Sequence, residues 1–151
     1  MGEHRILGID HVGIAVADLD EAIAWYGEAF GLVATHTEVN EEQGVREAML
    51  TAGAGGLDNM TAIQLLAPLR PDSAIGKFLD RNGPGIQQMA YRVVDIEATS
   101  DALRAQGKRL LYPEPRRGTA GSRINFLHPK DAGGVLVELV EPADAATAAA
   151  H

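Results

Sequence analysis

The sequence predicts an α+β fold in which two tandem βαβββ modules form a curled, mixed sheet around a cup. The main observation is an internal repeat of two segments. Residues 10–20 match residues 87–97, and residues 63–68 match residues 137–142. Each matching segment has the alternating pattern of a strand, so each copy begins and ends with a strand in the same relative place.

Glycine and proline at residues 83–85 separate the two copies. We therefore expect a single domain over residues 1–151, with repeat modules at about residues 8–68 and 85–142. The alanine-rich residues 143–151 carry no core-forming pattern and are expected to form a flexible tail.

The first module is expected to begin with a strand at residues 9–16. Its alternation places Ile14 on a face suited to burial under a helix and His11 on the opposite face. Asp18 has the character of a helix N-cap, and the helix that follows should end at Gly31. Further strands are expected at residues 32–40, 45–50 and 60–66.

Ser73 should cap a short helix that ends near Asn82, before the second module begins. That module repeats the order of the first one, with a strand at residues 86–93 and a helix from Ile96 to about Gln106. Its remaining strands are expected near Leu110, at residues 123–127 and at residues 135–141.

Composition excludes several classes of partner. The chain has 151 residues and a formal net charge of −8, which argues against nucleic acid because phosphate binding needs a basic surface. No window approaches 18 uncharged apolar residues, so we expect no membrane span, and the N-terminus lacks the apolar core of a signal peptide. The absence of cysteine excludes disulfides and thiolate ligands, and a cytoplasmic location is the simplest expectation.

Four polar residues occupy equivalent strand positions in the two copies: His11, Gln64, Gln88 and Glu138. On each strand, alternation puts the polar residue opposite the face that carries the helix, which predicts that all four lie inside the cup. A polar side chain buried on a strand is costly unless it has a partner. Taken singly, each residue would be a structural polar group, but the duplicated set predicts a metal site.

One imidazole, one carboxylate and two amide oxygens form a hard, oxygen-rich ligand set. Such a set suits Co²⁺, Mn²⁺, Ni²⁺ or Mg²⁺ better than a structural zinc ion. The other histidines are weaker candidates. His4 and His151 lie in terminal segments, and His36 has no duplicated counterpart. His128 precedes a proline and is expected to be structural or to line the substrate.

Five stretches carry a resemblance to a known family: residues 10–16, 42–47, 64–68, 123–130 and 134–139. Through them the chain resembles the vicinal oxygen chelate superfamily over about residues 8–142, and more narrowly the methylmalonyl-CoA epimerase family. The first stretch marks the superfamily only. The Gln-Gly-Val-Arg-Glu sequence that ends at Glu47 and the Arg-Ile-Asn-Phe-Leu-His-Pro-Lys sequence are more specific to the epimerases.

The resemblance implies an isomerase that interconverts (2R)- and (2S)-methylmalonyl-CoA by moving the proton on C2. It also implies a divalent metal ion, most simply Co²⁺, bound by His11, Gln64, Gln88 and Glu138. Position 88 departs from the family, which has a histidine there within a His-His pair, whereas this chain has Gln88. An amide oxygen coordinates more weakly than imidazole and prefers harder ions.

The resemblance assigns Glu47 and Glu138 as the two catalytic acid–base residues. Removal of the C2 proton creates an enolate-type intermediate, which a cation chelating the thioester and carboxylate oxygens would stabilise. Inversion needs one base on each side of C2, which accounts for two carboxylates. The local pattern alone would favour a solvent-facing glutamate at position 47.

The acyl-CoA substrate requires basic groups, and backbone N–H groups of residues 118–122 are candidates to receive the substrate carboxylate. The basic candidates are Arg70, Lys77, Arg116, Arg117, Arg123 and Lys130. We also expect a homodimer, because apolar edges of small duplicated folds often continue across an interface.

Other functions stay open at this point. A glyoxalase-type isomerase or lyase fits the ligand chemistry but leaves the two epimerase-specific stretches unexplained. A ring-cleaving dioxygenase would need two histidines and a carboxylate for iron, and His11 is the one histidine at the matching positions. A metal-free small-molecule-binding protein is supported by Gln88 and opposed by the other three ligand positions and Glu47.

Overall fold

The computed structural model describes residues 6–57 and 60–143. The chain separates into two compact units. We call residues 11–87 the N-terminal module, and residues 1–10 together with 88–151 the C-terminal module. His4, His151 and residues 144–151 of the expected tail lie outside the described residues.

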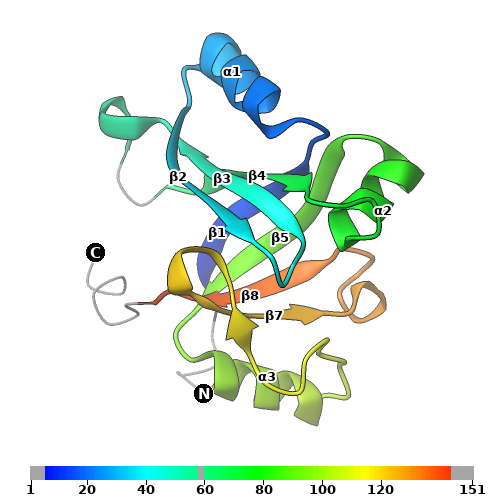
Figure 1. Ribbon diagram of the computed structural model, residues 1–151. Helices are drawn as coiled ribbons and strands as arrows, with labels where there is room; N and C mark the ends of the chain where they lie inside the picture. Colours follow the sequence, from blue (N-terminus) through cyan, green and yellow to red (C-terminus); the bar gives the residue numbers. More distant parts are fainter. Residues whose placement is uncertain (1–5, 58–59, 144–151) are drawn as a thin grey trace. The chain divides into compact units, whose positions relative to one another are not determined.

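The N-terminal module follows the predicted βαβββ order. Its elements are the second half of β1 (Ile6–Ala15), α1 (Leu19–Phe30), β2 (Val33–Asn40), β3 (Val45–Thr51) and β4 (Ala62–Pro68), followed by α2 (Ala74–Asn82). The strands lie in the order β2-β3-β4-β1, with β1 parallel to β4 and the other pairs antiparallel. Figure 1 shows α1 on one side of this sheet.

Helix α1 begins and ends where its capping residues predict. The side chain of Asp18 accepts a hydrogen bond from the backbone N–H of Glu21 at 3.0 Å, and Gly31 ends the helix with a φ of 72°. The buried face of α1 starts at Leu19 and packs on Ala48 and Leu65, whose side chains form the core of this module. No helix within the described ranges combines the length and apolar character needed to cross a membrane.

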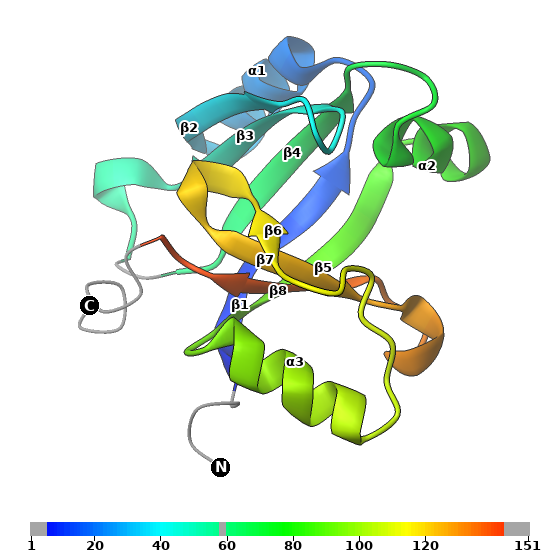
Figure 2. The ribbon, with the colours of Figure 1, turned by 60° about the horizontal axis from the view of Figure 1, so that its bottom comes forward.

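The C-terminal module contains β5 (Gly85–Val93), α3 (Ile96–Ala105), β6 (Arg116–Arg117), β7 (Arg123–Leu127) and β8 (Val137–Glu141). The strand order is β5-β8-β7-β6, with β5 parallel to β8. Its core lies between α3 and the sheet and includes Val93, Ile96 and Leu139. Figure 2 shows α3 running along this sheet.

The strand expected near Leu110 was wrong. Leu110 makes an isolated bridge with Leu127, and the short strand β6 forms later, at Arg116–Arg117. Pro113 and Pro115 explain the difference, because proline cannot donate a backbone hydrogen bond to a sheet. The buried side chain of Asn125 compensates locally by bonding to both the N–H and the C=O of Tyr112, at 3.0 and 2.9 Å.

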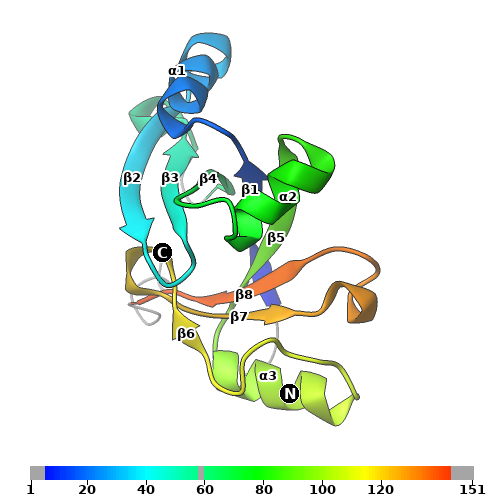
Figure 3. The ribbon, with the colours of Figure 1, turned by 45° about the vertical axis from the view of Figure 1, so that its right-hand side comes forward.

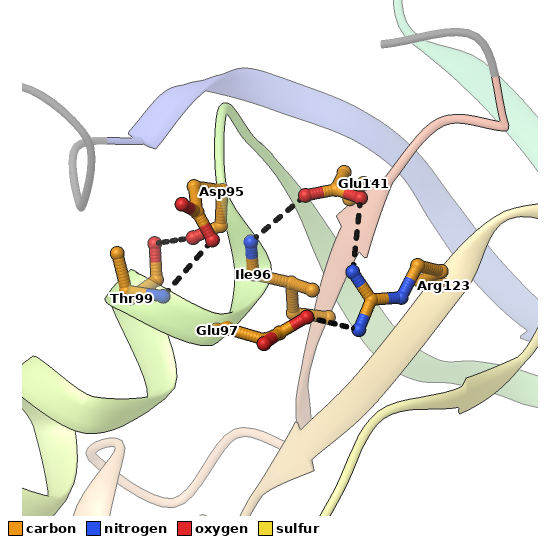
Figure 4. A network of polar contacts seen from close by, with 7 residues as sticks. Asp95, Ile96, Glu97, Thr99, Arg123 and Glu141 are labelled. Carbon is orange, nitrogen blue, oxygen red and sulfur yellow. Dashed lines mark hydrogen bonds and ion pairs between the residues drawn. The ribbon is translucent and has the colours of Figure 1, made fainter.

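A polar network ties α3 to the sheet of the C-terminal module, as Figure 4 shows. Arg123 contacts Glu97 of α3 and Glu141 of β8. Glu141 also accepts a hydrogen bond at 3.1 Å from the backbone N–H of Ile96, at the start of the helix. The hydrogen bond to Glu97 raises the pKa of the Arg123 guanidinium, although partial burial opposes this shift. Arg123 therefore has a structural role in addition to being a candidate CoA contact.

A second ion pair closes the segment between α3 and the last strand. Arg109 donates to Asp131 through its backbone N–H and its Nε, both at 2.9 Å, and through Nη2 at 3.2 Å. These hydrogen bonds stabilise the ionised carboxylate and lower the pKa of Asp131 from 3.8 to about 2. The side-chain hydrogen bond from Arg109 is the largest cause.

This lowered pKa predicts a pH-dependent contribution to stability. Because the pKa of Asp131 is lower in the folded state, its stabilisation is present above the unfolded value of 3.8 and disappears as the pH falls towards about 2. In urea denaturation series between pH 7 and pH 2, Asp131→Asn should be less stable than the wild type by a constant margin above about pH 5. That margin should shrink below pH 4.

Asp101→Asn provides the matched control, because Asp101 is highly exposed and lies 3.6 Å from Arg104. Its effect on stability should be small, as is usual for an exposed ion pair. A margin for Asp131→Asn that stays constant down to pH 2 would contradict the assignment.

Candidate active site

The strand register brings three predicted site residues onto one face of the N-terminal module. Gln64 of β4 lies opposite Gly13 of β1 and opposite Met49 of β3, so these three residues share a face. Alternation by two residues then places His11 and Glu47 on that same face. The three strands are neighbours in the sheet, and all three polar residues are buried.

This site face is opposite the face that α1 covers. The residues of β3 and β4 that contact the α1 core, Ala48 and Leu65, alternate with Glu47 and Gln64 along the strands. The alternation that we read from the sequence is therefore confirmed for this module. At one end of the site face, Ile75 of α2 packs on an apolar cluster with Ala15, Val45 and Leu66.

Glu47 and Gln64 are in direct contact. The amide Nε2 of Gln64 donates a hydrogen bond to Oε2 of Glu47 at 3.1 Å. Glu47 is only 3% exposed, so the solvent-facing orientation suggested by the local pattern is wrong. Because the amide nitrogen bonds to the carboxylate, the amide oxygen of Gln64 is the atom that this side chain offers to a cation.

The C-terminal module contains a second amide–carboxylate pair. Nε2 of Gln88 donates a hydrogen bond to Oε1 of Glu138 at 3.2 Å, and both side chains are buried. Ala90 lies opposite Glu138 in the register, so Gln88 and Glu138 share a face. Leu139, on the other face, belongs to the core under α3. Among the described residues, each module thus buries one carboxylate that accepts a hydrogen bond from a glutamine amide.

The polar set suits a hard divalent cation by its donor chemistry. It offers one imidazole, two amide oxygens and a carboxylate, all on buried residues. Within the described ranges there is no group of three or more His, Asp or Glu side chains able to hold a metal ion.

The candidate CoA contacts differ in their surroundings. Arg70 pairs with Asp72 at 3.2 Å, and the guanidinium of Arg116 lies 4.0 Å above the ring of Tyr112. In residues 118–122, the backbone N–H of Gly118 donates a hydrogen bond to the C=O of Ser122. The backbone N–H of Ser122 donates to the C=O of Thr119. His128, expected to be structural or to line the substrate, accepts a hydrogen bond at Nδ1 from the backbone N–H of Lys130.

One residue of this face was missed in the sequence. Glu38 of β2 lies directly opposite Glu47 of β3 in the register. The alternation of His36, Glu38 and Asn40 within the expected strand was the signal that could have identified it, because these residues must share one face.

Comparisons with known proteins identify the family of the chain. The family model described as the Glyoxalase/Bleomycin resistance protein/Dioxygenase superfamily matches residues 10–126. An ethylmalonyl-CoA/methylmalonyl-CoA epimerase of Cereibacter sphaeroides is 41% identical over 133 residues, which cover 87% of this chain and 95% of the relative.

Solved structures are similar over nearly the whole chain. The crystal structure of methylmalonyl-CoA epimerase from Mycobacterium tuberculosis is 57% identical with a TM-score of 0.86, covering 95% of this chain and 93% of that one. A methylmalonyl-CoA epimerase in complex with methylmalonyl-CoA and NH4+ is 51% identical with a TM-score of 0.85, covering 92% and 96%. The predicted resemblance and the α+β vicinal oxygen chelate fold are confirmed. The chain belongs to the Glyoxalase/Bleomycin resistance protein/Dioxygenase superfamily and, within it, to the methylmalonyl-CoA epimerase family.

Proposed function

We propose that this chain is an isomerase that interconverts (2R)- and (2S)-methylmalonyl-CoA by proton transfer at C2. The observation that carries the proposal is the 57% identity over 95% of the chain to a solved methylmalonyl-CoA epimerase. A second solved relative was crystallised with methylmalonyl-CoA itself, which supports an acyl-CoA thioester as substrate.

Glu47 and Glu138 are the proposed acid–base residues. They are the buried carboxylates among the residues that the structure describes, and each accepts a hydrogen bond from a glutamine amide. In the proposed reaction one carboxylate removes the C2 proton and the other delivers a proton to the opposite side of C2. The amide N–H groups hold the carboxylates in place, and the buried surroundings exclude competing water.

His11, Gln64, Gln88 and Glu138 are the proposed ligands of a divalent metal ion, with Co²⁺ first among the candidates. The buried imidazole, amide oxygens and carboxylate support this assignment. When bound, such an ion would stabilise the negative charge that develops on the thioester oxygen. Glu138 would then serve both as a ligand and as an acid–base residue.

The proposal also includes a homodimer in the cytoplasm. The absence of cysteine suits a reducing compartment.

Trp25 and Phe30 of α1 are 55% and 64% exposed and stack edge to face, with ring centroids 5.4 Å apart. Exposed aromatic side chains of this kind are common at protein interfaces. We expect light scattering to give the mass of two chains, and a monomer would contradict the dimer.

The role of Glu47 can be tested by substitution. Glu47→Gln should keep the fold while epimerisation falls by at least about a hundredfold, because a general base typically contributes about 10²- to 10⁴-fold. The reaction is followed in D₂O from each epimer separately. The wild type should place solvent deuterium mainly in the inverted product, because each base exchanges with its own side of C2. A near wild-type rate in Glu47→Gln would remove it from the mechanism.

The metal site can be tested by titration calorimetry with Co²⁺ on apoprotein. The wild type should bind one ion per chain, and His11→Ala should abolish binding because it removes the imidazole ligand. His36→Ala should bind as the wild type does and is the matched control. Gln88→His should bind equally or more tightly, since imidazole is the stronger ligand.

Full retention of Co²⁺ binding in His11→Ala would refute the site. A large loss of affinity in Gln88→His would show that the amide is required at that position.

A further inference from the structure

Leu66 is the apolar neighbour of the proposed base Glu47. The two residues are direct partners in the antiparallel register of β3 and β4, so their Cβ atoms lie about 4.5–5.5 Å apart on the same face. The other direct partner of Glu47, on β2, is the charged residue Glu38. Across the sheet, Glu47 therefore has an apolar neighbour on one side and a charged neighbour on the other.

The polarity of the site face also changes along the strands at Glu47. In one direction along β3, the next residue on this face is Met49, which lies opposite the polar ligand candidate Gln64. In the other direction it is Val45, which belongs to a buried apolar cluster. The other buried members of this cluster are Ala15, Leu66 and Ile75 of α2. Glu47 thus stands at the boundary between a polar part and an apolar part of the face.

The start of α2 holds the apolar cluster in place, and Figure 3 shows α2 beside β1 and β4. Oγ of Ser73 accepts a hydrogen bond from the backbone N–H of Gly76 at 3.1 Å and donates one to the C=O of Arg70 at 2.8 Å. A Cβ atom on Gly76 would lie 2.4 Å from the carbonyl oxygen of Pro71, so this position needs glycine. These close contacts fix Ile75, which is 4% exposed, against the cluster.

The substrate carries one apolar group on C2. The proposed reaction brings the C2 hydrogen to Glu47, whereas the carboxylate and thioester oxygens suit the proposed cation ligands. The alkyl group is bonded to the same carbon, so it must lie beside the base as well. Contact with apolar side chains stabilises an alkyl group, and the charged Glu38 on the other side of Glu47 does not provide it.

We propose that Leu66, supported by Val45 and Ile75, contacts the alkyl group on C2 and sets the largest alkyl group that the site accepts. The inference rests on the proposed epimerase function. Protein interiors are close-packed, so a longer alkyl group has to displace Leu66, which is packed in the same cluster as Ile75. A shorter side chain at position 66 leaves room for a longer alkyl group.

Substrates of different size test this role. The kcat/KM values for the epimerisation of methylmalonyl-CoA and propylmalonyl-CoA are measured with Co²⁺-loaded enzyme. Leu66→Val removes one methylene group from the side chain. The ratio of kcat/KM for propylmalonyl-CoA to that for methylmalonyl-CoA should therefore rise by about tenfold or more, the usual effect of one methylene group in an apolar pocket. Leu66→Phe should lower the same ratio.

Leu65→Val is the matched control. Leu65 precedes Leu66 on β4 and is also buried, but it packs under α1 on the opposite face. This substitution removes the same methylene group from the core, yet the ratio should stay within about twofold of the wild-type value. Ile75→Val should raise the ratio in the same direction as Leu66→Val, and it carries the same test should Leu66→Val fail to fold.

A substrate without an alkyl group separates substrate contact from a structural effect. Glu47 should also catalyse the exchange of the C2 hydrogens of malonyl-CoA for deuterium in D₂O. Because malonyl-CoA makes no alkyl contact, Leu66→Val should leave this catalysed exchange within about twofold of the wild-type rate.

The outcomes separate the inference from the proposed function. A wild type that does not epimerise methylmalonyl-CoA would overturn both. An active wild type with an unchanged ratio in folded Leu66→Val would overturn the alkyl contact alone. An equal rise of the ratio in Leu65→Val would also overturn it. So would an equal loss of epimerisation and malonyl-CoA exchange in Leu66→Val, because that pattern indicates a structural effect on Glu47.

Discussion

The burial of a carboxylate on a β-strand is the constraint on which the candidate site depends. A charged group removed from water is strongly destabilising unless hydrogen bonds replace its hydration. In both modules the replacement is a glutamine amide on the adjacent strand: Gln64 for Glu47 and Gln88 for Glu138. The alternation of the strands makes this possible, since the apolar residues that pack under the helices occupy the other face of each sheet.

Apolar side chains surround both buried carboxylates. Ala15, Val45 and Leu66 lie on the site face of the N-terminal module, and Ile75 of α2 packs on them. Near Glu138, Ala90 and Phe126 belong to an apolar cluster on the corresponding face. Low polarity around a carboxylate strengthens its interaction with nearby charges and with amide donors.

The sequence predicted the elements better than the contacts between them. Asp18 and Asp95 cap their helices through local hydrogen bonds to residues three positions later, so those helix starts could be read directly. The contact between Gln64 and Glu47 depends on the register of β3 and β4, which no local pattern encodes. The position of Glu38 opposite Glu47 depends also on a register shift between Ala34 and His36. Near Leu110 the apolar pattern was correct, but the prolines that follow prevented a strand.

The two modules have diverged at the positions of the proposed site residues. The strand that ends each module has Gln64 in one copy and Glu138 in the other, and the first strand has His11 and Gln88. The repeat matches Leu66 with Val140. Glu47 lies opposite Leu66 in the register, and Ile124 lies opposite Val140. Buried Ile124 is therefore the counterpart of Glu47 in the C-terminal module. Within residues 6–57 and 60–143, each module therefore buries a single carboxylate, on a different strand. Two carboxylates close together make the ionisation of each other less favourable. One carboxylate with one amide donor per module is therefore less destabilising than two carboxylates on the same face of each module would be. The duplication thus supplies two similar sheets, and the divergence places their buried carboxylates on different strands.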